Sequence, residues 1–157
     1  MYGDGKVKIV RVGSEQIVRP RKENDMPISY EVHNDGHFIH AIASGVLSSQ
    51  EFVDYEIAHA NDERIKPPVN ELLEIKHNAC KLITKDDCSK ILEKRKEIPK
   101  LPTPHRCAIV VSISNSNAWN IAKFYEGMVM LHHPEDVIVF ADERIARIWL
   151  GVEKTRE

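Results

Sequence analysis

The stretch RCAIVVSISNSNAWNIAKFYEGM, residues 106–128, decides the fold class. It begins with a run of branched apolar residues that has no polar face, which is typical of a strand buried on both sides in a parallel sheet. Four small polar residues, 114–117, come next. Apolar residues then recur at helical spacing, at Ala118, Ile121, Ala122, Tyr125 and Val129. We predict a buried strand over 106–113, a polar turn, and a helix over 116–131.

An antiparallel hairpin is predicted near the start of the regular pattern. The runs SYEVH and HFIHAIA lie on either side of Asn34-Asp35-Gly36. These three residues tolerate the positive φ that a tight hairpin turn needs. Two further strands are expected over 69–75, after Pro67-Pro68, and over 137–140, where the sequence reads VIVF.

Three more helices are indicated by capping residues. Ser48 with Glu51 forms a capping box, and Thr84 and Asp142 are good N-cap residues. Gly151 is suited to end the last helix. In the first helix we expect one inward face, formed by Val53, Ile57 and Ala60. In the second helix we expect the inward residues to be Cys88, Ile91, Leu92 and Ile98, with the KRKE run, 94–97, outward.

The resulting element order is β-β-α-β-α-β-α-β-α. Strands that alternate with helices pair in parallel through right-handed crossovers. We therefore predict an α/β fold with a mixed, mostly parallel sheet opened by an antiparallel hairpin, in a single domain over 26–157. Residues 1–25 differ in pattern, and KVKIVRV alternates charged with branched residues. We expect an N-terminal extension here, either upstream of a true start at Met26 or forming an extra hairpin on a sheet edge or a second subunit.

Composition limits the classes of partner. The 157 residues carry a net charge of −2, which gives no electrostatic basis for binding nucleic acid. No apolar run reaches the roughly 20 residues of a membrane span. The three cysteines are Cys80, Cys88 and Cys107; an odd number without CxxC spacing argues against disulfides and zinc. We expect a cytoplasmic protein in which Cys88 and Cys107 are small core residues.

No catalytic, cofactor-binding or metal-binding motif is found. The patterns GxGxxG, GxxxxGK[ST], GxSxG and HExxH are all absent. His105, at the start of the buried strand, is the histidine we expect to be sensitive to pH. Ser112 and Ser114 lie at the end of that strand, but no carboxylate that would orient a triad is identifiable. Three polar groups converging on Ser112, Ser114 or His105 would favour an enzyme.

The polar turn, Ser114, Asn115, Ser116 and Asn117, has two interpretations. A strand end followed by a helix N-terminus offers free amides and a partial positive charge, which suits an anionic ligand. Ligands also bind at the carboxyl ends of parallel strands. However, no glycine lets a phosphate approach the backbone, and Ser and Asn are the preferred N-cap residues. A capping turn is the simpler interpretation.

The segments YEVHNDGHFIHAIASGVLSSQEF and RCAIVV…AWNIAKFYEGM…VIVFADERIARIWL together resemble the STAS fold, and more closely the SpoIIAA-like family. The resemblance covers about 28–151 and implies a non-enzymatic regulatory module that binds a protein partner. Phosphorylated members carry a DxSGLG-like stretch before the second helix. The corresponding segment here, EIKHNACKLITKDDCSK, has no Ser-Gly pair. The resemblance therefore implies a fold more than a function.

The segment FYEGMVML, residues 124–131, is apolar on nearly all sides. Such a helix is buried against something on two faces. We expect either a homodimer interface through Met128 and Leu131 or an apolar ligand pocket beneath the helix. Trp119, Tyr125 and His105 are the candidate residues of such a pocket, with the 114–117 turn at its polar end. A regulatory protein-interaction module is the first functional hypothesis, and a small-molecule or lipid-like ligand-binding protein is the second.

Overall fold

A single five-stranded sheet organises the computed structural model, which describes residues 27–98 and 104–153. The strands are β1 (Ile28–His33), β2 (Phe38–Ala43), β3 (Val69–Ile75), β4 (His105–Val111) and β5 (Asp136–Phe140). They lie side by side in chain order. The pair β1–β2 is antiparallel, and all the other pairs are parallel. The predicted α/β class, with a mostly parallel sheet opened by an antiparallel hairpin, is confirmed.

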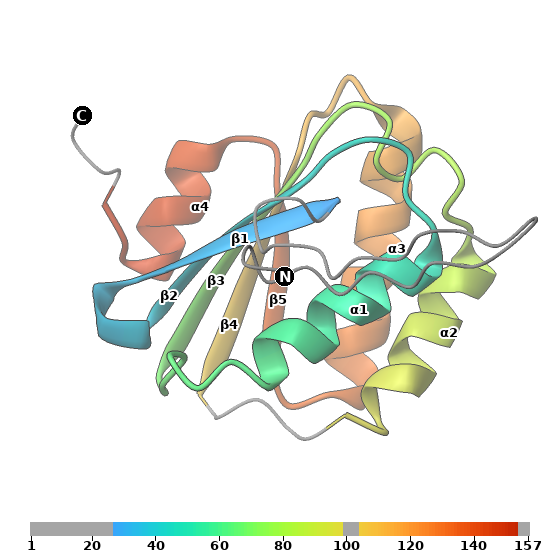
Figure 1. Ribbon diagram of the computed structural model, residues 1–157. Helices are drawn as coiled ribbons and strands as arrows, with labels where there is room; N and C mark the ends of the chain where they lie inside the picture. The colour runs from blue at the N-terminus through green and yellow to red at the C-terminus, as the bar shows by residue number, and fades with distance from the viewer. Residues whose placement is uncertain (1–26, 99–103, 154–157) are drawn as a thin grey trace, which may run out of the picture.

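Four α-helices cover the two faces of the sheet (Figure 1). They are α1 (Ser49–Ala60), α2 (Lys85–Arg95), α3 (Ser116–His132) and α4 (Glu143–Leu150). Each parallel strand extends the sheet at the same edge as the strand before it. Right-handed crossovers therefore place α1, α2 and α3 on one face. The last helix, α4, turns back over the other face and packs on β3 and β4. The protein therefore has three layers.

The hairpin turn confirms the prediction made from Asn34-Asp35-Gly36. Asn34 and Asp35 both have φ of 55°, and Gly36 has φ of 99°. A Cβ atom on Gly36 would lie 2.1 Å from the carbonyl oxygen of Arg64. Only glycine fits this position, because the adjoining chain runs directly against its backbone.

Side chains alternate between the two faces along each strand. In β3, Val69, Leu73 and Ile75 belong to the larger apolar cluster under α1–α3, whereas Leu72 belongs to the smaller cluster under α4. Strand β4 is paired on both edges, as expected of a run with no polar face. Glu71 shares the face of Leu73, so a carboxylate is placed inside the larger cluster.

The helix termini follow the predicted capping residues. Ser48 and Thr84 each form a capping box with the acidic residue three positions later. Asp142 accepts from the backbone of Arg144 at the start of α4, and Gly151 ends that helix with φ of 73°. Gly151 thus supplies the left-handed conformation that this kind of helix end needs.

Two predicted helix faces are wrong in part. In α1, Ile57 is 40% exposed, while Tyr55 and His59 are buried. In α2, Cys88 is buried as predicted, but Arg95 from the KRKE run also turns inward, with its side chain 12% exposed. Polar side chains take these inward positions because each finds a charged or hydrogen-bonding partner inside.

Some predictions fall outside the described residues. The N-terminal extension, 1–25, is among them. In the parts of the chain that the structure describes, no helix is both long and apolar enough to cross a membrane.

Candidate functional site

A cavity lies between the sheet and helices α1, α2 and α3. Its volume is about 60 Å³. The apolar wall consists of Phe52, Leu73, Ile75, Ile83, Ile91, Ile109, Ile121, Ala122 and Val137, together with three cysteines. The polar wall consists of Tyr55, Glu56, Glu71, Tyr125 and Glu135. Glu71 and Glu135 lie at the amino ends of β3 and β5, so the polar wall is at that edge of the sheet.

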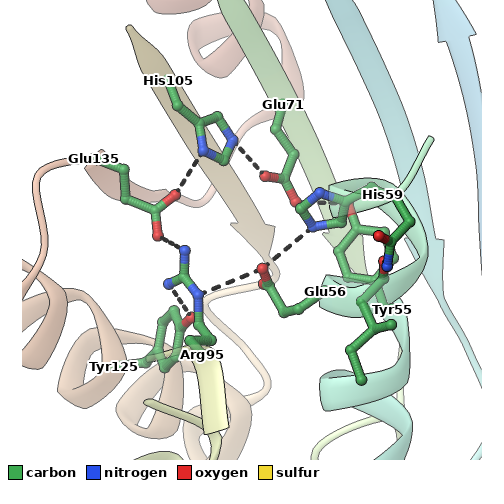
Figure 2. A network of polar contacts seen from close by, with 10 residues as sticks. Tyr55, Glu56, His59, Glu71, Arg95, His105, Tyr125 and Glu135 are labelled. Carbon is green, nitrogen blue, oxygen red and sulfur yellow. Dashed lines mark hydrogen bonds and ion pairs between the residues drawn. The ribbon is translucent and has the colours of Figure 1, made fainter. Parts of the chain in front are cut away.

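His105 joins two of these carboxylates (Figure 2). It is the first residue of β4, and its Nε2 lies 2.8 Å from Glu71 while its Nδ1 lies 3.0 Å from Glu135. Burial lowers the pKa of His105, but hydrogen bonds to Glu135 and Glu71 outweigh it and raise the pKa to about 10. At neutral pH this ring is therefore an imidazolium, with both of its N–H groups donating.

Arg95, the last residue of α2, joins the next pair of carboxylates (Figure 2). Its Nε lies 3.4 Å from Glu56, its Nη2 forms an ion pair with Glu135, and its Nη1 donates to the Tyr125 hydroxyl at 2.8 Å. Burial lowers the pKa of Arg95, but Glu56 outweighs it and the net direction is upward. One guanidinium thus ties α1, α3 and the start of β5 together.

His59 and Tyr55 complete the network from α1. Tyr55 donates to Glu71 at 2.5 Å, and His59 Nε2 lies 3.2 Å from Glu56. His59 is fully buried, yet among the described residues neither of its ring nitrogens has a hydrogen-bond partner of normal geometry. Burial lowers the pKa of His59, but Glu56 and Glu71 outweigh it and raise the pKa. The ring therefore favours the charged form more than a free histidine does.

The charges of this network balance only when His59 is protonated. The carboxylates of Glu56, Glu71 and Glu135 have lowered pKa values and are ionised at neutral pH. Arg95 and His105 supply two positive charges, which leaves one negative charge over. Since an unbalanced buried charge costs roughly several kcal/mol, the network favours a protonated His59, which supplies the third positive charge.

Glu71, His105 and Glu135 could also be considered as metal ligands. One ligand atom from each lies within 4.8 Å of the other two. However, both ring nitrogens of His105 already contact a carboxylate. A metal would need the neutral ring with a free lone pair. The geometry is that of a charged histidine between two carboxylates, which is not an open coordination site.

The three cysteines line the apolar part of the cavity and are free and buried, which confirms the prediction for Cys88 and Cys107. Burial raises the pKa of Cys80 to about 12 and that of Cys88 to about 11. Burial also raises the pKa of Cys107. These thiols stay protonated at neutral pH and act as small apolar residues.

The predicted turn at 114–117 lies at the opposite edge of the sheet, after the carboxyl end of β4. Asn115 accepts from the Ala118 N–H at 3.3 Å, which caps α3, and donates to the His77 carbonyl at 2.6 Å. Asn117 donates to the Cys80 carbonyl at 3.3 Å, and the hydroxyl of Ser114 lies 2.7 Å from that of Ser112. Neither this turn, with its exposed Ser116, nor the half-buried Trp119 is part of the cavity wall.

The other predicted residues are divided between the site and the surface. His105 and Tyr125 belong to the polar network. Met128 packs partly against the core of its own chain. Leu131 is 77% exposed, and its neighbour Met130 is 73% exposed. The candidate interface residues therefore do not act together as one buried face within a single chain.

Sequence reasoning missed five charged residues of the network: Glu56, His59, Glu71, Arg95 and Glu135. One signal was available for Glu71, because it alternates with Val69, Leu73 and Ile75 on what is expected to be the inward side of a strand. Another was the spacing of Tyr55 and His59, which puts them on one helix face. Glu135 and Arg95 lie near the ends of elements, and no local pattern marks them.

Comparisons with known protein families, with curated proteins and with solved structures found no match for this chain. The class that the structure itself defines is a three-layer α/β protein with a buried charged network beside a cavity. Any functional inference therefore depends on the geometry of that site.

Proposed function

We propose that the protein binds a small molecule in the cavity between the sheet and helices α1–α3. The observation that carries this proposal is the combination of a mostly apolar wall with a few converging polar groups. Small-molecule sites are typically built in this way, with apolar contacts for affinity and a few polar groups for orientation.

The buried charges support a role beyond stability. A buried ion pair adds little to folding stability compared with well-packed apolar residues, because the cost of desolvation offsets most of the attraction. Here three carboxylates, a guanidinium and two imidazoles are gathered beside one cavity. Clusters of groups with perturbed pKa values occur preferentially at functional sites. We therefore treat the network as the polar end of a binding site.

The volume of the cavity limits the size of the ligand. A cavity of about 150 Å³ holds one benzene molecule in an engineered protein. The enclosed 60 Å³ is smaller, so it suits a headgroup of a few atoms.

The experiment is a fragment screen by two-dimensional NMR on the labelled full chain, with two cavity-filling variants. We expect fragments to shift the amide signals of Leu73, Ile109 and Ala122, which line the cavity. Ala122→Leu on α3 and Cys88→Met on α2 fill the space from opposite walls and should abolish those shifts. Circular dichroism would verify that each variant is folded. Shifts confined to other surfaces, or unchanged by both variants, would overturn the proposal.

A second candidate is a SpoIIAA-like regulatory module that acts through protein contacts, most simply as a homodimer. Its specific support is the exposed apolar end of α3, at Met130 and Leu131. Native mass spectrometry would test it, with Leu131→Glu compared with Lys123→Glu, an exposed site on the same helix. A dimer lost only in the first variant supports this candidate. A monomer at all concentrations rejects the homodimer. The unpaired cysteines support our proposal of a reducing, cytoplasmic setting for either function.

A further inference from the structure

The polar wall of the cavity is one-sided in charge. The carboxylates of Glu56, Glu71 and Glu135 all line the cavity, together with the hydroxyl-bearing side chains of two tyrosines. None of the three cationic side chains of the network belongs to the cavity wall. They are His59, Arg95 and His105, and each forms an ion pair with at least one of these carboxylates (Figure 2). A molecule in the cavity therefore meets hydrogen-bond acceptors and negative charge first.

One of these carboxylates, that of Glu135, can accept a further hydrogen bond. The side chain of Glu135 is 7% exposed, and its Oε2 binds His105. Its Oε1 forms the ion pair with Arg95. A carboxylate oxygen has lone pairs for more than one donor. A donor entering from the cavity could therefore bind Glu135 beside these two partners.

Resting on the proposed function, we infer that the ligand is a small apolar amine, bound through its protonated nitrogen to the carboxylate wall. An ammonium group has only donors, and it adds the positive charge that the network lacks when His59 is neutral. The apolar wall then holds the alkyl part of the ligand. An anionic ligand would face like charge in a water-poor site, which is strongly unfavourable.

The proposal predicts an exchange between the ligand and a proton. His59 balances the cluster in the empty site, and its ring is flanked by Glu56, Glu71 and His105 from the elements around it. When an ammonium group enters, the proton on His59 is no longer needed for balance. Binding of the amine should therefore become tighter as the pH rises through the pKa of His59.

The test compares three molecules of the same shape: isobutylamine, isobutanol and isobutyrate. Binding is measured by NMR titration of the wild-type chain at low salt. We expect the amine to bind at least about tenfold more tightly than the alcohol, as one charge-assisted hydrogen bond is worth that factor or more. Isobutyrate should not bind. In Glu135→Gln the ratio of the affinities for the amine and the alcohol should fall about tenfold.

The outcomes separate this inference from the proposed function. If the alcohol or the carboxylate binds in the cavity as tightly as the amine, the amine inference fails and the binding site remains. If no fragment of any charge enters the cavity, both fail. Glu56→Gln is a second variant from a different wall, in case Glu135→Gln does not fold. If both variants fold and neither reduces the preference for the amine, the selectivity does not come from these carboxylates. That result would overturn the inference.

Discussion

The two edges of the parallel sheet are built from different chemistry. At the amino edge, Glu71, His105 and Glu135 are buried and ionised, and each depends on residues distant in sequence. At the carboxyl edge, the turn 114–117 is mostly exposed and neutral, and it caps its own helix.

Parallel α/β proteins usually bind ligands at the carboxyl edge, where helix N-termini gather. Here the polar groups of the cavity wall lie at the amino edge, where helices α1 and α2 end. Cationic side chains near helix C-termini are favoured by the helix dipole, which suits His59 and Arg95. The comparison teaches that side-chain charges, and not backbone amides, define the polar chemistry of this site.

The largest effect should follow the loss of Glu71. Glu71→Ala removes the acceptor for Tyr55 and one partner of His105, and leaves both buried. Breaking a buried charged pair costs about 3–5 kcal/mol. We expect that loss in the free energy of unfolding, measured by urea denaturation. Glu93→Ala, at an exposed residue of α2 paired only with Lys96, should change little. Equal effects of the two substitutions would contradict the structural role of the amino edge.

The next effect is a pH dependence that comes from His105. Its folded-state pKa of about 10 lies above its usual value of 6.5, so its stabilisation is complete below pH 6.5 and is lost as the pH rises toward 10. Glu71 works in the opposite direction. Its folded-state pKa of about 2 lies below its usual 4.5, so its contribution is lost as the pH falls from 4.5 toward 2. We therefore expect maximal stability between about pH 4.5 and 6.5.

Urea denaturation between pH 6.5 and 9 would measure this dependence. The wild type should lose stability on the order of a few kcal/mol over that range. His105→Gln keeps hydrogen-bonding groups but cannot titrate, so its decline should be much smaller. Parallel declines in the two proteins would show that His105 is not held as an imidazolium.

A smaller effect is expected at Arg95. Arg95→Lys keeps the charge but cannot reach Glu56, Glu135 and Tyr125 together. Losing one such hydrogen bond to a charged group costs about 1.5–3 kcal/mol. The control is Arg144→Lys, which changes an 85% exposed side chain bound to nearby Asp142. Thermal unfolding should show a lower midpoint for the first variant only. An unchanged midpoint would mean that one ammonium group suffices to join the three elements.

The two edges also differ in how well sequence reasoning finds them. Caps and turns depend on residues within about four positions, so Ser48, Thr84 and Asn34-Asp35-Gly36 could be identified directly. The strand over 69–75 could be predicted from its flanking prolines and its length. The coarse fold follows from such local rules.

The charged network could not be predicted in the same way. Glu71 and His105 are 34 positions apart, and they meet because β3 and β4 pair in a particular register. Arg95 looks like part of a solvated run until α2 is placed against α3. A charged residue is assigned to the surface by default, and only the tertiary arrangement shows that these charges have partners.

The smallest effects are expected at the carboxyl edge. Asn115→Ala removes the cap of α3 and the bond to the His77 carbonyl, which should cost about 1 kcal/mol in unfolding free energy. Ser114→Ala removes only a hydroxyl pair with Ser112 on the surface and should be close to neutral. Neither substitution should change the affinity of isobutylamine, because the turn lies at the edge away from the carboxylates. If Asn115→Ala weakened amine binding while the fold stayed intact, the polar end of the binding site would have to be reassigned to this turn. The chemistry of the two edges would then need to be considered together.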